Sequence, residues 1–134
     1  FFHAITFQRN DYRAVPIGDR LQPVDPDGTW MGDPVAHWDG DTLVVVTEAF
    51  NDQSWIAPQG YIHGYDMKVT EKFRRDGNKL YYDVTVEDPE YLQKPWVKDT
   101  VTLNKIMDPK YRMDESPPCS DRDNKNLVGK QREM

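Results

Sequence analysis

The segment at residues 35–50 constrains the fold more than any other part of this chain, because it predicts a β-hairpin. Asp39-Gly40 is a two-residue turn signal, since a type I′ turn needs positive φ at both central positions and Asp and Gly tolerate that best. The arm after the turn is the most β-prone run in the sequence. Both of its faces are largely apolar at the centre, which predicts a central strand covered on both sides or a barrel strand.

Two later segments alternate apolar and polar side chains with the period of a strand. Residues 79–87 show the alternation most clearly, and residues 66–74 show it too. Asp76-Gly77-Asn78 between them is a second hairpin signal, because glycine supplies the left-handed residue of the turn. In the later strand we expect the inward-facing side chains to be Leu80, Tyr82, Val84 and Val86.

Further strands are predicted at residues 1–7, 12–17 and 96–107, where Asp99 leaves the register of the last strand open. The loop from residue 18 to residue 34 is rich in proline and glycine. Trp30 and Met31 within it are expected to form a plug folded back on the core. Residues 88–92 are expected to form a connection with one helical turn.

About six strands joined mostly by short hairpins predict an all-β domain, an antiparallel meander that forms a curled sheet or a partial β-barrel. Six strands close a barrel poorly, because about eight are needed for side chains to fill the interior. We assign this domain to residues 1–113. Residues 114–134 are predicted to be a polar C-terminal tail whose short helix, capped by Ser120, docks on the body or on a partner.

The composition excludes some classes of partner. The formal net charge of −6 over 134 residues repels phosphate backbones, which argues against nucleic acid. The longest apolar run, at residues 43–46, is far too short to insert into a membrane. The chain begins inside what looks like a strand, so we expect a preceding segment, such as a signal peptide. The single cysteine, Cys119, is either a chance thiol or the partner of a cysteine elsewhere.

A series of motifs in order covers residues 30–129, about three quarters of the chain. Its first members are Trp30-Met31-Gly32, Trp-Asp-Gly-Asp-Thr-Leu-Val-Val at residues 38–45, and Phe50-Asn51-Asp52 with Trp55. Next come His63 ahead of residues 69–75, a connection from Asp88-Pro89 to Lys94-Pro95-Trp96, and an ending from Cys119 to Lys130. In this order they resemble a family of uncharacterised secreted bacterial proteins.

The resemblance implies a location and a type of fold, and no established activity. It implies a bacterial protein that is periplasmic or secreted, with a longer N-terminal region. At two positions this chain departs from the family: Asp33 stands where the family tends to have His, and Val46 stands where it tends to have Asp. If those positions form a polar site in relatives, that site is altered here.

His63 is the leading catalytic candidate, because histidine exchanges protons near neutral pH and long loops are often functional. A cofactor-free acid–base enzyme would use His63 with Asp66 or Glu48 on a small apolar or aromatic molecule. The competing interpretation is a histidine that packs the loop. His3 and His37 are interpreted as structural strand residues.

The sequence favours no metal and no cofactor. The histidines lack the spacing of a zinc site. Asp25-Pro26-Asp27-Gly28 and Asp39-Gly40-Asp41 suggest calcium, yet neither supplies a spaced set of ligands. Glycine-rich phosphate loops and a nucleophile-elbow motif are absent.

The four tryptophans and seven tyrosines are the remaining signal, since Trp and Tyr pack cores, line pockets and anchor protein interfaces. The leading hypothesis is a non-catalytic, extracytoplasmic binding or accessory domain that packs on other protein chains, as a small subunit of a larger assembly or as a homo-oligomer. The alternatives are the acid–base enzyme and a lipocalin-like carrier of a small apolar ligand. The candidate ligand- or partner-binding residues are Trp30, Trp55, Tyr61, Tyr65 and Trp96.

Overall fold

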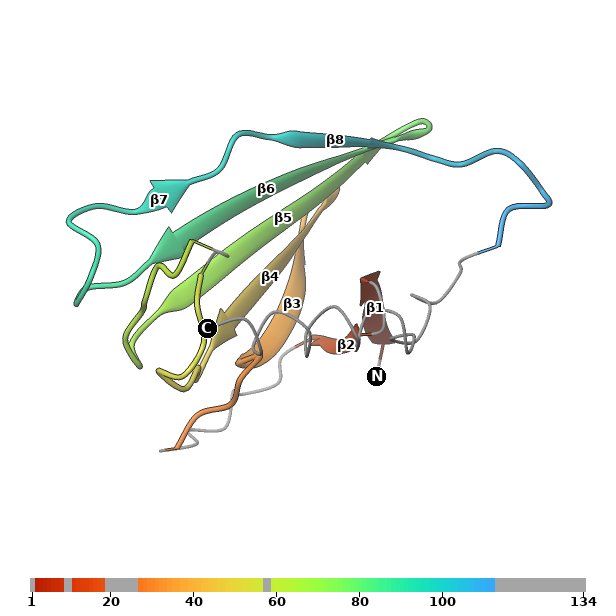
Figure 1. The fold of residues 1–134 in the computed structure, drawn as a ribbon. Helices are drawn as coiled ribbons and strands as arrows, with labels where there is room; N and C mark the ends of the chain where they lie inside the picture. The colour runs from red at the N-terminus through yellow and green to blue at the C-terminus, as the bar shows by residue number, and fades with distance from the viewer. Residues whose placement is uncertain (1, 9–10, 19–26, 57–58, 113–134) are drawn as a thin grey trace, which may run out of the picture.

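The structure is a computed structural model that describes residues 2–8, 11–18, 27–56 and 59–112, and within them it is all-β. One curled sheet contains every strand, and it does not close, because β1 pairs with β2 alone at one end and β7 and β8 pair with β6 alone at the other (Figure 1). The curled, mainly antiparallel sheet predicted from the sequence is therefore confirmed. The strands are β1 (Phe2–Gln8), β2 (Asp11–Ile17), β3 (Asp33–Asp39), β4 (Thr42–Glu48), β5 (Lys68–Asp76), β6 (Lys79–Glu87), β7 (Trp96–Val97) and β8 (Val101–Asn104).

The predicted central hairpin is confirmed as β3 and β4, but its turn lies one residue later than expected. Asp39 pairs with Thr42, so Gly40 and Asp41 are the two central residues. Gly40 has a φ of 59°, and Asp41 has no positive φ. This is the φ pattern of a type II′ turn, in which only the first central position needs glycine. The predicted type I′ turn on Asp39-Gly40 is therefore wrong, although the hairpin signal itself is correct.

The β2–β3 junction departs from the antiparallel pattern. β2 runs parallel to β3, and their register contains a single pair, Ile17 with Ala36. One further backbone bond, from Gly18 N–H to the carbonyl oxygen of Ala36 at 2.9 Å, extends this contact. A parallel neighbour needs a crossover rather than a hairpin, which is why β2 and β3 are not joined by a tight turn.

One face of the sheet carries most of the core. Val15, Ala36 and Val45 are buried in one cluster, and Met67, Val84 and Val86 in a second. The inward face expected for β6 is thus confirmed for Val84 and Val86. The opposite face of β4 is also covered at its centre, because Val44 is only 7% exposed while its neighbour Val45 is 1% exposed.

The prediction for the last strand needs correction. The strand expected over residues 96–107 is interrupted, because the chain leaves the ladder at residues 98–100 and splits into β7 and β8. Two hydrogen bonds still link this segment to β6: the Lys98 N–H donates to the Val84 carbonyl oxygen, and the Thr100 hydroxyl donates to the Asp83 carboxylate. The expected helical turn after β6 is present, with Leu92 N–H bonded to the Asp88 carbonyl oxygen at 2.9 Å. The predicted tail and Cys119 lie outside the described residues.

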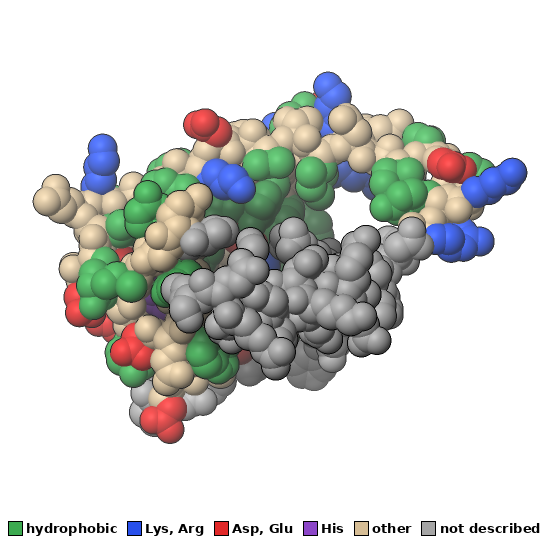
Figure 2. Space-filling model, viewed as in Figure 1, with side chains coloured by type: hydrophobic (Ala, Val, Ile, Leu, Met, Phe, Trp, Pro, Cys, Tyr) green, Lys and Arg blue, Asp and Glu red, His purple; other side chains and the backbone are tan. Residues whose placement is uncertain are grey.

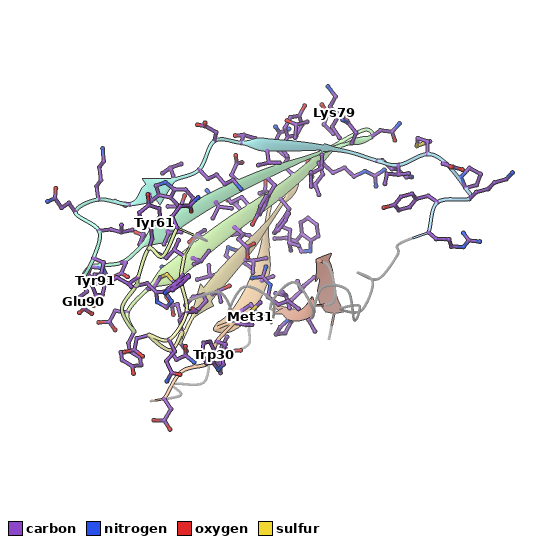
Figure 3. All side chains as sticks on the ribbon, in the orientation of Figure 1. Trp30, Met31, Tyr61, Lys79, Glu90 and Tyr91 are labelled. Atoms are coloured by element: carbon purple, nitrogen blue, oxygen red, sulfur yellow. The ribbon has the colours of Figure 1, made fainter. Side chains whose placement is uncertain are left out.

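The predicted plug at Trp30 and Met31 is wrong, since their side chains are 60% and 58% exposed (Figure 3). Thr29 explains this, because its backbone N–H and carbonyl oxygen bond Ala49 and Asn51 at 2.9 Å each. These bonds hold the segment against the end of β4 as a turn. The next two side chains therefore lie at the tip of the turn and point away from the core.

Candidate functional site

The loop between β4 and β5 begins with an unusual backbone conformation. Ala49 has a φ of 55°, the only positive φ at a non-glycine residue within the described ranges. Phe50 then forms an isolated bridge with Thr29. The conformation turns the chain away from β4 and starts the long loop that leads to β5.

His63 is held inside this loop and is only 2% exposed. Its Nδ1 lies 3.0 Å from the Gly64 carbonyl oxygen, which can only accept, so Nδ1 carries a hydrogen. Its Nε2 lies 2.8 Å from Ser54 Oγ, and the two atoms form a hydrogen bond. The ring also meets Phe50 edge to face, with the centroids 5.9 Å apart. Both ring nitrogens therefore serve to close the loop.

The other two members of the predicted catalytic group lie elsewhere. Asp66 is exposed, and the Glu48 carboxylate lies 3.8 Å from Lys68 Nζ. Within the described residues His63 is hydrogen-bonded to Ser54 and Gly64, and the structure does not bring His63, Asp66 and Glu48 together. Sequence reasoning missed Ser54, and a serine nine residues before a histidine in a loop gives no signal of this contact.

Asp88 ties the loop to the turn after β6. Its side chain is 3% exposed, and one carboxylate oxygen accepts the Gly64 N–H at 2.8 Å. The other accepts the N–H groups of Glu90 and Tyr91 at 3.0 and 3.2 Å. An Asp that caps a turn in this way is recognisable in a sequence, but its bond to a residue 24 positions earlier is not. The carboxylate thereby fixes Tyr91 beside the loop.

A pocket of about 660 Å³ opens where this loop, the turn after β6 and β7 meet. Its floor consists of core residues, and its rim carries aromatic rings that are 47–63% exposed. Tyr61 and Tyr91 lie at this end of the sheet (Figure 3). A shallower groove continues from it along residues 91–97. We call it the aromatic pocket; it is lined by Ile56, Gln59, Tyr61, Ile62, Val86, Tyr91, Leu92 and Trp96.

The structure divides the aromatic residues that the sequence singles out. Tyr61 and Trp96 both line the aromatic pocket. Trp30, Trp55 and Tyr65 are exposed, but they do not line it. Sequence reasoning missed the other lining residues, among them the exposed Ile62 and Tyr91, since nothing local shows that residues 30 positions apart share a rim.

Carboxylates surround the phenols at this end of the molecule. A hydrogen bond from Tyr91 to Glu90, together with the nearby negative charge, raises the pKa of Tyr91. Asp52 raises the pKa of Tyr65 in the same way. Both phenols therefore keep their protons at neutral pH and contribute neutral aromatic surface. Figure 2 shows exposed apolar side chains mixed with acidic and basic ones over this region.

A polar trio lies in the middle of the apolar face. Glu71 is 6% exposed, and its carboxylate accepts a hydrogen bond from Arg13 at 2.5 Å and from the Tyr82 hydroxyl at 2.7 Å. Burial, followed by the bond to Glu71, raises the pKa of Tyr82. The carboxylate is paired and hydrogen-bonded, as a buried charge needs to be. Arg13 lies 58 positions before Glu71 in the chain, so sequence reasoning did not find this contact.

No three His, Cys, Asp or Glu side chains come together as a metal site within the described ranges. The same part of the chain has no helix long and apolar enough to cross a membrane. Comparisons of the chain with protein-family models, with curated proteins and with solved structures found no match. The resemblance described from the sequence motifs therefore stays a prediction.

Proposed function

We propose that this chain is a non-catalytic binding domain that packs on another protein chain through the aromatic pocket and the adjoining β7. The observation that carries the proposal is that Tyr61, Tyr91 and Trp96 come from three separate segments and line one pocket while each is about half exposed or more. Large aromatic side chains over a concave apolar floor are typical of the energetic centre of a protein interface.

The edge of the sheet beside the pocket supports the same function. Val97 in β7, next to the pocket residue Trp96, is 66% exposed. Further along the same edge, at the other end of β6, Leu103 in β8 is 48% exposed. Both strands pair with β6 on one side only in the described structure. Exposed apolar side chains along the outer edge of a sheet favour association with another chain.

The burial of His63 argues against the acid–base enzyme. A general base has to reach the proton that it removes, whereas this ring is 2% exposed and both of its nitrogens are already bonded. An accessory role in an extracytoplasmic assembly agrees with the resemblance drawn from the motifs, which implies export.

The test is the native mass of the protein taken from its own source without overexpression. We expect it to run with other chains in fixed stoichiometry. In the reconstituted assembly, Trp96→Ala and Tyr61→Ala should each weaken binding about thirtyfold, since truncating an interface hot spot costs about 2 kcal/mol.

The matched control is Trp38→Ala, because Trp38 is 60% exposed and lies at the hairpin-turn end of the sheet, away from the aromatic pocket. This variant should bind as the unaltered chain does. A native species of one chain's mass, a small homo-oligomer, or equal losses in all three variants would contradict the proposal.

A further inference from the structure

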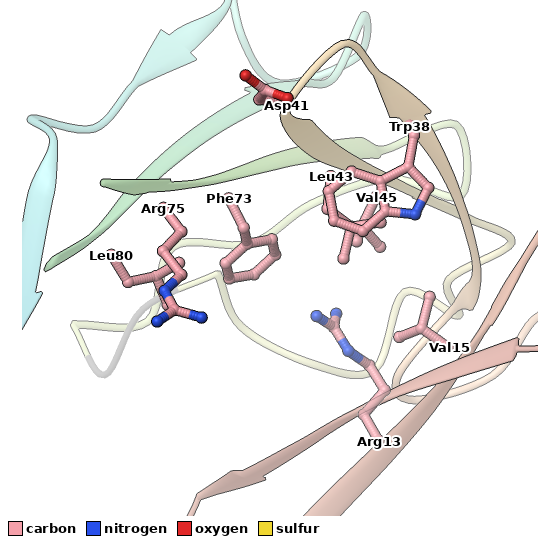
Figure 4. A pocket seen from close by; sticks show the side chains of 9 residues that line it. All are labelled: Arg13, Val15, Trp38, Asp41, Leu43, Val45, Phe73, Arg75 and Leu80. Atoms are coloured by element: carbon pink, nitrogen blue, oxygen red, sulfur yellow. The ribbon is translucent and has the colours of Figure 1, made fainter. Parts of the chain in front are cut away.

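A second pocket lies on the same apolar face, at the end where the hairpin turns are. It has a volume of about 320 Å³, at the lower end of the range of small-molecule sites. Figure 4 shows its apolar floor and the arginine side chains that project over it. We call it the turn-end pocket; it is lined by Arg13, Val15, Trp38, Asp41, Leu43, Val45, Phe73, Arg75 and Leu80.

The floor of this pocket consists of packed core side chains. Val15 and Val45 are each 1% exposed and belong to the core. Phe73 stacks on Tyr82, with the ring centroids 4.8 Å apart and the planes inclined by 19°. A preformed apolar surface binds an alkyl chain without first having to be ordered.

The two arginines at the pocket differ in whether a carboxylate pairs with them. The Arg13 guanidinium is neutralised by Glu71. Arg75 donates from Nε to the Gly77 carbonyl oxygen at 2.9 Å, and no carboxylate pairs with it among the residues that the structure describes. Its guanidinium points into the pocket, while Asp41 lies apart from it near the turn after β3 (Figure 4). One fixed, unpaired cation therefore faces the apolar floor.

We propose that the turn-end pocket binds a free amphipathic anion, a medium-chain fatty carboxylate, with its alkyl chain on the floor and its carboxylate on Arg75. Charge complementarity selects this ligand, because an arginine fork matches the two oxygens of a carboxylate. The inference is independent of the proposed function, since Trp96 and Tyr61 do not line this pocket.

The test is titration calorimetry of the whole chain with decanoate. Decyltrimethylammonium is the comparison of equal chain length and opposite charge, and butyrate is the comparison without a long chain. We expect decanoate to bind at least tenfold more tightly than either. Octanoate should bind roughly tenfold more weakly than decanoate, because two fewer methylenes are buried.

Arg75→Gln should weaken decanoate binding about tenfold. Arg74→Gln is the matched control, since Arg74 stacks on Tyr81 at 4.4 Å and does not line the pocket. The indole N–H resonance of Trp38 should shift on binding, while that of Trp96 should not. The proposal would be overturned if decanoate did not bind, or if decanoate and decyltrimethylammonium bound equally well. It would also be overturned if the two arginine variants had equal effects, or if the resonance of Trp96 shifted instead of that of Trp38.

Discussion

Thr47 is a buried side chain that destabilises the native sheet. The residue is 0% exposed, on the apolar face near the end of β4. Its Oγ1 has no hydrogen-bond partner, as judged from the described part of the chain. A buried hydroxyl without a partner loses its bonds to water and gains nothing in return. Thr47 therefore lowers the free energy of unfolding of the native sheet.

Replacing this threonine by valine should stabilise the protein. Thr47→Val removes the unpaired hydroxyl and keeps the branched shape, so the free energy of unfolding should rise by about 1 kcal/mol. Urea denaturation measures the change. Thr85→Val is the control, since Thr85 is half-buried on the opposite face of β6. A loss of stability in Thr47→Val would show that the hydroxyl has a partner after all.

At this scale the sequence was least informative. It singled out His63 as the catalytic candidate, but it could not show that Ser54 and Gly64 would satisfy both ring nitrogens. Which residues contact each other across a loop depends on its path. That path here depends on Asp88, from a distant segment, and on the backbone of Ala49.

At the scale of elements, the glycines mark two different constraints. Gly40 in the β3–β4 turn has a φ of 59°, and a Cβ built there would meet nothing within 4 Å. Gly32 before β3 has a φ of 68°, and its Cβ would lie 2.6 Å from Thr47 Cγ2 and 2.8 Å from the Glu48 carbonyl oxygen. Position 32 therefore requires glycine for two reasons: the positive φ, and the lack of room for a Cβ atom.

The two alanine variants separate these contributions. Gly40→Ala should cost about 1 kcal/mol of unfolding free energy, from the left-handed φ alone. Gly32→Ala carries the same cost and adds about 1–3 kcal/mol for overpacking against β4. Thermal and urea denaturation of the two proteins give the difference. Equal losses would mean that the chain at residue 32 moves aside without strain.

Strands were the part of the structure that the sequence predicted well. The alternation in β5 and β6 is local, so Val84 and Val86 could be assigned to the buried face from the sequence alone. The break at residues 98–100 was not predicted, because the sequence left only the register of this strand open at Asp99. Trp30 was wrongly placed in the core because its exposure follows from the bonds of Thr29 to a distant segment.

At the scale of the whole molecule, the sheet consists of two parts with little backbone between them. The β1–β2 hairpin meets β3 through one pair of residues, Ile17 and Ala36, and one further bond from Gly18. Side chains supply most of the remaining contact: Val15 packs on Ala36 and Val45, and Arg13 pairs with Glu71 of β5. The ion pair therefore links the hairpin to the rest of the sheet.

Weakening this ion pair should loosen one part of the molecule selectively. Glu71→Gln removes the negative charge that holds Arg13. A hydrogen bond to a charged group contributes about 1.5–3 kcal/mol to the free energy of unfolding. Amides of residues 11–17 should then exchange their hydrogens roughly tenfold faster or more, while the β4–β5 ladder keeps its protection. Hydrogen exchange followed by NMR measures both. Glu87→Gln, at an exposed position of β6, should change neither.

An equal rise in exchange along β4, β5 and β6 would show that Glu71 supports the whole core rather than this junction. A rise confined to the hairpin would show that residues 2–17 open as a unit of their own. Such a unit has an exposed apolar side as soon as it leaves β3, because Val15 is 1% exposed in the closed form.

The narrow junction between β2 and β3 has a consequence for encounters between molecules. The surface that β1–β2 covers on its own sheet is identical to the one that an opened neighbour presents. Two molecules that open together can therefore exchange hairpins and recover every lost contact, which is domain swapping. The protein concentration then determines whether a hairpin returns to its own chain or packs on a neighbour. The strength of the Arg13–Glu71 ion pair determines how often the hairpin opens.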